Sequence, residues 1–258
     1  MALGKLGARG GFGSLGVLGT VNAWSPTRLA AGTNAAWWDA SNSGSVGVIS
    51  GQVAQLTDLS GNGNNLVQSD ASKQPTYNGQ ILFSGAGDYL QTASNFTVSG
   101  STQRTIFAAA KNFTSFPTIV FWGAQSAGNG FGLDCKLATA ATGYVWGQSD
   151  LNFGTPFTGN LGLLVFGNDN VNSYGGANGQ LAITTVADAI NTTAAALAMG
   201  ARVSGITNFA MVQIAEVLIV TGAMSAALRQ TIEGYMAWKW GFASSLPGGH
   251  PYKSRRPT

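Results

Sequence analysis

Short apolar or aromatic runs alternate with turns rich in Gly, Asn, Ser and Asp from about residue 23 to residue 223. Runs this short between turn signals predict β-strands. Helical periodicity is lacking between them, which argues against βαβ units. The expected strands lie at 36–39, 46–49, 52–57, 80–84, 88–92, 105–111, 117–123, 130–137, 143–148, 161–167, 180–186, 195–203 and 209–221. This spacing favours an all-β protein, a two-sheet antiparallel jelly-roll sandwich.

The composition supports a packed domain and excludes several classes of protein. Of the 258 residues, 45% are hydrophobic and 9% are charged, so disorder driven by charge is excluded. Cys135 is the single cysteine, which excludes a disulfide scaffold and a zinc site built from cysteines. His250 is the single histidine, so no mechanism that needs two imidazoles fits this chain.

The net charge of +3 resides in the two ends of the chain. Six of the thirteen bases lie in residues 1–30 and 247–258, which contain no acid: Lys5, Arg9, Arg28, Lys253, Arg255 and Arg256. The remaining middle has a net charge of −3 and does not resemble a nucleic-acid-binding surface. We therefore expect no nucleic-acid partner, and we expect the basic tail to dock on a protein.

No run of 18 apolar residues predicts a membrane-spanning helix. Glycine interrupts the N-terminal segment throughout, so a signal peptide is not expected. These features predict synthesis in a cytosol without export by the general secretory route.

Residues 1–22 form a Gly-rich N-terminal arm in which Gly4, Gly7, Gly10, Gly13, Gly16 and Gly19 recur at every third position. This period fits an extended arm of the polyproline-II type with one apolar stripe, and a flexible leader is the alternative. The Gly-x-Gly-x-x-Gly at Gly11 to Gly16 arises from this repeat. It lacks the strand and helix of a dinucleotide site, so we reject that interpretation.

One helix is expected near 225–240, at the end of a domain spanning 23–245. Ser225 can cap its start and Gly241 can end it. One apolar face is expected to contain Leu228, Ile232, either Tyr235 or Met236, and Trp240. Residues 246–258 contain three prolines and are predicted to form an extended basic tail.

Two passages resemble a known family. The first contains Trp37-Trp38-Asp39-Ala40-Ser41, the segment 53–65, Gln74-Pro75-Thr76-Tyr77 and the segment 82–90. The second contains the segments 215–220, 232–241 and 246–252. Together they resemble concanavalin-A-like lectin and glucanase sandwiches of the laminin-G type, in the form found in bacterial surface and phage proteins.

The resemblance implies a jelly roll with a rim that can bind a ligand. Phages use such domains as tail, fibre and capsid-surface components, and other members bind carbohydrates or hydrolyse glucans. Where the family usually has Phe-Asp-Gly, this chain has Phe83-Ser84-Gly85, which weakens an inherited calcium or sugar site there.

The acidic residues offer few catalytic pairs. Glu216 and Glu233 are the only glutamates, and neither lies in a Glu-x-Asp-x-x-Glu strand of a retaining glucanase. We expect Glu216 to share a strand face with Ile214 and Leu218 and to pair with Lys239 or Arg229. Glu233 is interpreted as a charge on the helix surface.

The loop from Asp58 to Asn65 partly matches a calcium loop but lacks the acid at its twelfth position. A turn in which Asp58 accepts hydrogen bonds from neighbouring amides is the favoured interpretation. If calcium binds, its expected ligands are Asp58, Asn62 and Asp88.

Seven tryptophans offer platforms on which a sugar could stack. Trp37, Trp238 and Trp240 are assigned to core and helix packing. Trp122 and Trp146 lie nearer glycine-rich loops and are the predicted ligand-binding residues.

The sequence thus predicts a non-catalytic phage virion protein of the tail or capsid surface, without a required cofactor. Its partners would be other virion proteins, bound through the arm and the tail, and further copies of itself, as a trimer. The alternatives are a module that binds a carbohydrate or receptor, such as a host-surface glycan, and a glucanase.

Overall fold

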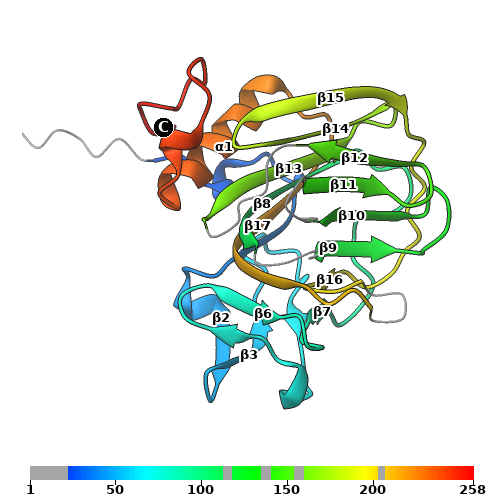
Figure 1. Cartoon of the computed structure of the whole chain (residues 1–258), viewed down its shortest axis with the longest axis vertical. Helices are drawn as coiled ribbons and strands as arrows, with labels where there is room; N and C mark the ends of the chain where they lie inside the picture. Colours follow the sequence, from blue (N-terminus) through cyan, green and yellow to red (C-terminus); the bar gives the residue numbers. More distant parts are fainter. Residues whose placement is uncertain (1–22, 113–117, 135–140, 154–159, 203–206) are drawn as a thin grey trace, which may run out of the picture.

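The chain folds into antiparallel strands covered on one side by a single described helix (Figure 1). This computed structural model describes residues 23–112, 118–134, 141–153, 160–202 and 207–258. The N-terminal arm and Cys135 lie outside the described residues.

Six strands form a first run of hydrogen-bonded neighbours, in the order β1-β17-β8-β13-β14-β15. Their bounds are β1 Asn34–Asp39, β8 Arg104–Asn112, β13 Gly162–Asn168, β14 Asn172–Ala177, β15 Gln180–Ala187 and β17 Met211–Thr221. All five pairings are antiparallel, as a meander or Greek-key protein requires.

A second run has the order β12-β11-β10-β9-β16-β7-β4-β3-β2. Its strands are β2 Val46–Ile49, β3 Gln52–Leu56, β4 Leu66–Val67, β7 Leu90–Thr92, β9 Thr118–Gly123, β10 Gly130–Asp134, β11 Ala141–Val145, β12 Ser149–Phe153 and β16 Ala198–Met199.

Two further strands connect the runs. β5 Thr76–Tyr77 pairs with β3 and with β6 Ile81–Ser84, and β6 pairs with β17. The described strands therefore form one hydrogen-bonded network of 17 strands. The all-β prediction is confirmed. The prediction of two separate jelly-roll sheets is not confirmed, because all described strands belong to one network.

The main core lies between the two runs. It contains Ala108 and Phe166 from the first run and Trp122, Phe131 and Leu133 from the second, all buried. The rings of Phe131 and Phe166 stack with their centroids 4.7 Å apart. Burial of this apolar surface is the main favourable term that holds the runs together.

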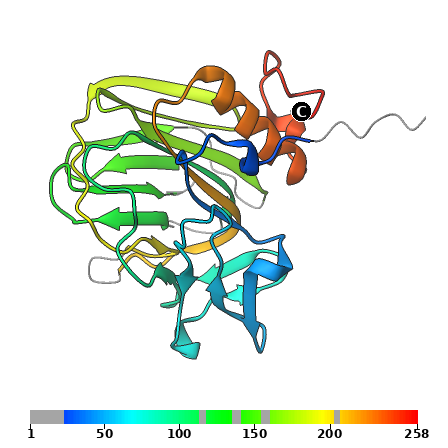
Figure 2. The same cartoon turned by 180° about the vertical axis from the view of Figure 1, so that it is seen from behind.

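The helix α1, Ala226–Lys239, covers the other face of the first run (Figure 2). The Ser225 side chain accepts a hydrogen bond from the Leu228 amide at 3.1 Å, so Ser225 is the N-cap. The predicted apolar face is confirmed, because Ile232 and Met236 are buried against Phe107 and Leu218. Gly241 follows the helix with φ of +80°.

Short 3-10 helices occupy several connections: η1 Pro26–Arg28, η2 Ser43–Ser45, η3 Ala71–Lys73 and η4 Ala243–Ser245. No helix in the described ranges is long and apolar enough to cross a membrane.

The tail was predicted to be extended, and this is wrong. Residues 247–255 form a series of turns that fold back on α1 (Figure 1). Lys253 donates hydrogen bonds to the carbonyl oxygens of Ser244 and Leu246, which holds the tail in this bent path.

Candidate functional site

A bulge in β17 turns Glu216 toward the helix. The pairing of β17 with β8 shifts register between Ile214 and Glu216. Ile214 lies in the main core, whereas Ala215 and Leu218 both lie under α1. A bulge places consecutive residues on one side of a sheet. The prediction that Glu216 shares a face with Ile214 is therefore wrong, while its sharing a face with Leu218 is confirmed.

Glu216 is the centre of a polar cluster between the first run and α1. One carboxylate oxygen accepts hydrogen bonds from the Trp37 indole at 2.7 Å and the Tyr235 hydroxyl at 2.9 Å. The other accepts from Lys239 Nζ at 2.9 Å and the Trp240 indole at 2.7 Å. We call Trp37, Asp39, Glu216, Tyr235, Lys239 and Trp240 the Glu216 cluster.

Asp39 is directly opposite Glu216 in the antiparallel pair of β1 and β17. Residues opposite each other share a face of the sheet, so both carboxylates reach the helix side. Lys239 Nζ lies 2.5 Å from Asp39 Oδ2 and 2.9 Å from Glu216 Oε2 and bridges them. The predicted pairing of Glu216 with Lys239 is confirmed.

Burial raises the pKa of Glu216 above its ordinary value of 4.5. Lys239 opposes this shift and Asp39 adds to it, because opposite charge favours the ionised form and like charge disfavours it. Burial also raises the pKa of the Tyr235 hydroxyl, with a further contribution from Glu216. The hydrogen bonds and ion pairs of the cluster connect β1 and β17 to the covering helix.

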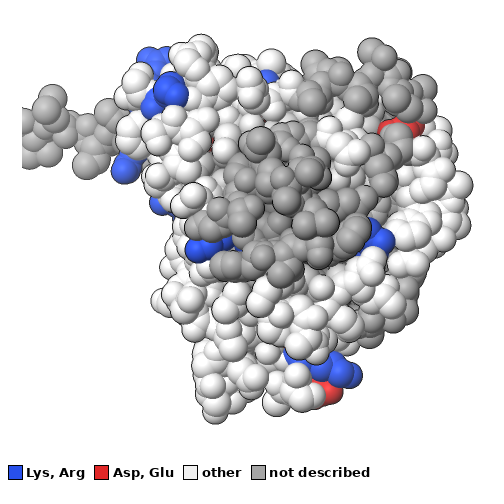
Figure 3. All heavy atoms as spheres, viewed as in Figure 1, with Lys and Arg blue, Asp and Glu red and all other residues white. Residues whose placement is uncertain are grey.

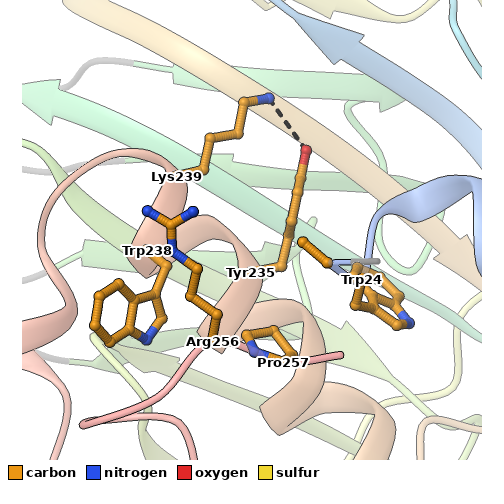
Figure 4. Close-up of a pocket in the computed structure, with 7 residues that line it drawn as sticks. Trp24, Tyr235, Trp238, Lys239, Arg256 and Pro257 are labelled. Carbon is orange, nitrogen blue, oxygen red and sulfur yellow. Dashed lines mark hydrogen bonds between the residues drawn. The ribbon is translucent and has the colours of Figure 1, made fainter. Parts of the chain in front are cut away.

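A cavity of about 170 Å³ lies beside the Glu216 cluster, with Tyr235 and Lys239 common to both (Figure 4). We call it the aromatic pocket; its lining is Ala23, Trp24, Tyr235, Trp238, Lys239, Arg256 and Pro257. The rings of Trp24 and Tyr235 meet edge to face, with centroids 5.5 Å apart. The Arg256 guanidinium lies over the Trp238 ring, 5.5 Å from its centroid.

The pocket is assembled from three distant segments of the chain. The Trp24 amide donates to the Pro257 carbonyl at 3.1 Å, and the Trp238 indole donates to the Tyr252 carbonyl at 2.7 Å. Gly234 allows the tail to approach the helix, since a Cβ at this position would lie 2.5 Å from Tyr252 Cβ. The folded tail therefore forms one wall of the pocket.

A buried hydrogen bond between α1 and His250 holds the same tail. Glu233 contacts Arg229 within α1 and lies 3.1 Å from His250 Nε2 in the tail. Glu233 and His250 are buried, so the interpretation of Glu233 as a surface charge is wrong. Glu233 is buried because the tail covers it, and the spacing of residues along the helix does not show this contact.

The two tryptophans predicted to bind a ligand differ in exposure. Trp122 is fully buried, and its indole donates to the Val98 carbonyl at 2.8 Å, so the expected exposure is wrong. Trp146 is half-buried between Phe121 and Tyr144, and the Arg202 guanidinium covers its ring at 5.1 Å. A ligand on Trp146 stays a prediction.

The Asp58 loop has the predicted turn geometry. The Asp58 carboxylate accepts hydrogen bonds from the amides of Trp37, Ser60 and Asn64 at 2.9–3.0 Å. Gly61 and Gly63 have positive φ. These contacts confirm the interpretation of Asp58 as an acceptor for neighbouring amides.

The expected calcium ligands are used elsewhere in the described structure. Asn62 donates to the Asn34 carbonyl at 2.6 Å, and Asp88 accepts from the amide and hydroxyl of Ser84. The described residues contain no group of three or more His, Cys, Asp or Glu that could hold a metal. Calcium at Asp58, Asn62 and Asp88 stays a prediction.

Sequence reasoning missed the aromatic pocket. Trp238 was assigned to packing, and neither Trp24 nor Arg256 was singled out as a binding residue. The sequence does contain one indication of a binding site, an aromatic-rich helix followed by a tail with basic and no acidic residues. This composition does not show that the tail folds back onto the helix.

Comparisons with known proteins find similarity to solved structures and none at the level of sequence. No protein-family model and no curated protein sequence matches it. A sialidase from Trypanosoma rangeli, solved with sialic acid, is similar with a TM-score of 0.56 and 9% identity. The match covers 79% of this chain and 33% of the sialidase.

Two further similar structures are an arabinofuranosidase and a domain of an arabinanase. Domain 4 of AbnA, an extracellular arabinanase from Geobacillus stearothermophilus solved with arabinotriose, has a TM-score of 0.52 and 16% identity over 76% of this chain and 96% of the domain. An arabinofuranosidase solved with arabinofuranosyl-α-1,2-xylobiose has a TM-score of 0.52 and 11% identity. That match covers 70% of this chain and 50% of the arabinofuranosidase.

These similarities define the fold as a sheet-rich one that occurs in carbohydrate-active enzymes. The chain spans about half of the arabinofuranosidase and a third of the sialidase. The expectation of a non-catalytic phage virion protein is contradicted, because the similar structures are glycosidases or a domain of one. The concanavalin-A-like and phage resemblances are likewise not shown.

Proposed function

We propose that this chain is a domain of a carbohydrate-active enzyme and that the aromatic pocket holds a sugar. The observation that carries this proposal is the convergence of Trp24, Tyr235 and Trp238 around one opening (Figure 4). Sugars present apolar C–H faces to aromatic rings, and their hydroxyls need polar partners at the rim. Arg256 supplies such a partner, whereas the three donors of Lys239 are used by Asp39, Glu216 and Tyr235.

The fold supports the same proposal. AbnA domain 4, whose structure contains arabinotriose, aligns over nearly its whole length with this chain. A second cavity, of about 350 Å³ beside Asn62, Thr97 and Thr221, lacks aromatic side chains in its lining. The aromatic pocket is therefore the better site for a sugar ring.

Titration calorimetry of the full chain with arabinotriose and with xylobiose tests the proposal. We expect saturable binding of at least one oligosaccharide, weakened about tenfold or more by Trp238→Ala through loss of ring contact. Trp146→Ala is the matched control and should leave binding unchanged. If no oligosaccharide binds, or if Trp146→Ala removes binding while Trp238→Ala does not, the pocket is not the site.

A second candidate is glycoside hydrolysis by Asp39 and Glu216. The specific observation in its favour is geometric: Asp39 and Glu216 lie opposite each other on β1 and β17 and share Lys239, and glycosidases use a pair of carboxyl groups as acid and as base or nucleophile. Release of nitrophenol from nitrophenyl arabinofuranoside should then disappear in Glu216→Gln. Undiminished release in that variant, or no release from the native chain, would exclude this candidate.

We also propose that the two strand runs are the facing layers of a jelly roll. The main core supports this, since its buried residues come from both runs and meet at Phe131 and Phe166. A crystal structure in which the runs do not face each other would contradict it.

A further inference from the structure

Arg256 differs from the other cations near the aromatic pocket. Lys239 is bridged to Asp39 and Glu216, and Arg229 is paired with Glu233. The described contact of Arg256 is with the face of the Trp238 ring, and no described carboxylate forms an ion pair with it. Its side chain is exposed and lines the pocket.

The position of the Arg256 guanidinium suits a planar anion. Figure 4 shows the guanidinium near Trp238 among the side chains that line the pocket. A guanidinium stacked on an aromatic ring keeps its N–H donors free at the edge. Such a fork binds a carboxylate through two parallel hydrogen bonds, which are stronger than neutral ones.

The surrounding charge is positive. Residues 247–258 contribute Lys253, Arg255 and Arg256 and no acid. Lys and Arg atoms are exposed at the end of the molecule that bears the C-terminus (Figure 3). This field attracts anions and adds to the local effect of Arg256.

We propose that the aromatic pocket prefers an acidic sugar, a uronic acid whose carboxylate is held by Arg256 while its ring contacts the aromatic side chains. The inference rests on the proposed function, because it names the class of sugar that the same pocket takes. Neutral sugars would lack the charge-assisted pair with Arg256 and would bind more weakly.

The test compares trigalacturonic acid with its methyl ester, in which each carboxyl group has lost its charge and gained a methyl group. Titration calorimetry with the full chain should give about tenfold tighter binding of the acid. Higher ionic strength should reduce the difference, because salt screens exposed charges.

Two arginine variants locate the preference. Arg256→Gln should bring the ratio of the two dissociation constants close to one. Arg255→Gln is the matched control: this exposed neighbour donates to the Pro251 carbonyl, lies outside the pocket lining and should leave the ratio unchanged. Circular dichroism of both variants checks that the fold is intact.

Each outcome has a distinct meaning. Equal binding of acid and ester, or a preference that survives Arg256→Gln, overturns the acidic-sugar inference and leaves the proposed function standing. Binding of arabinotriose without binding of trigalacturonic acid does the same. If no oligosaccharide of any charge binds, the proposed function fails and the inference fails with it.

Discussion

The two faces of the first strand run stabilise a cation in different ways. On the face under α1, Lys239 is neutralised by Asp39 and Glu216. On the face toward the main core, Arg104 is fully buried and lies 5.7 Å from the centroid of the Trp122 ring and 5.3 Å from that of Phe131.

Neutral groups hold Arg104. It donates to the carbonyl oxygens of Thr102 and Gly100 at 2.6 and 2.7 Å and to the Thr192 hydroxyl at 2.9 Å. Burial lowers the pKa of Arg104 to about 10, which leaves it charged at neutral pH. Dipoles and ring faces can thus replace a counter-ion when a guanidinium has enough acceptors around it.

The largest effect is expected on the paired side. Lys239→Met leaves two buried carboxylates without their cation and should reduce the free energy of unfolding by about 3–5 kcal/mol in urea titrations. Lys73→Met is the control, because Lys73 pairs with Asp70 on the exposed surface and should matter by less than about 1 kcal/mol. Similar losses in both variants would contradict a special role for the cluster.

A smaller effect is expected on the other side. Arg104→Lys keeps the charge but loses the fork that reaches several acceptors at once, so unfolding should become easier by about 1–3 kcal/mol. Urea titration measures this loss. If Arg104→Lys is as stable as the native chain, the positive charge at this position stabilises the fold and the additional hydrogen bonds of the guanidinium do not.

Weakening α1 should reduce stability on the face of the first run that α1 covers and leave the face that contains Arg104 unchanged. Ser225→Ala removes the N-cap and should lower stability by about 1 kcal/mol, while Ser225→Asp should restore the cap. Hydrogen exchange should become faster in α1 and stay unchanged around Arg104. Faster exchange at Arg104 would mean that the two faces open together.

The pH dependence is the smallest expected effect and has a definite sign. The pKa of Glu216 is raised in the folded chain, so the unfolded chain releases this proton at lower pH. The contribution of Glu216 to stability should therefore fall as the pH rises from about 4.5 to the folded pKa and stay level above it. The difference in unfolding free energy between the native chain and Glu216→Gln should follow this course; a rising difference would contradict the raised pKa.

Local signals predicted the elements that are stabilised locally. Ser225, the apolar spacing through Ile232 and Met236, and Gly241 each act within α1, so its bounds could be read from the sequence. The long strand β17 was also expected, because only Gln213 and Glu216 interrupt its apolar run between Met211 and Val220.

Elements stabilised by distant partners were missed. β14 contains Tyr174-Gly175-Gly176 and is absent from the expected strands, yet it pairs on both sides with β13 and β15. β4 and β5 have two residues each and are too short for a periodic pattern. β12 was also missed, since the expected strand 143–148 ran across the turn before it.

The site was predictable in part for the same reason. The pairing of Glu216 with Lys239 follows from the small number of acids, but the bulge at Glu216 does not show in the apolar pattern. The aromatic pocket requires Trp24, Trp238 and Arg256 to meet. These residues belong to different segments, and no local rule brings them together.

The contact between Trp24 and Pro257 has a practical consequence for anyone who handles this protein. Polypeptide attached at the C-terminus starts beside the aromatic pocket, because Pro257 lines it and accepts a hydrogen bond from Trp24. A purification tag or a surface linker at this end would crowd the mouth of the pocket. The exposed turn at Ser50 and Gly51 between β2 and β3 lies at the opposite end of the molecule and is the better point of attachment (Figure 1).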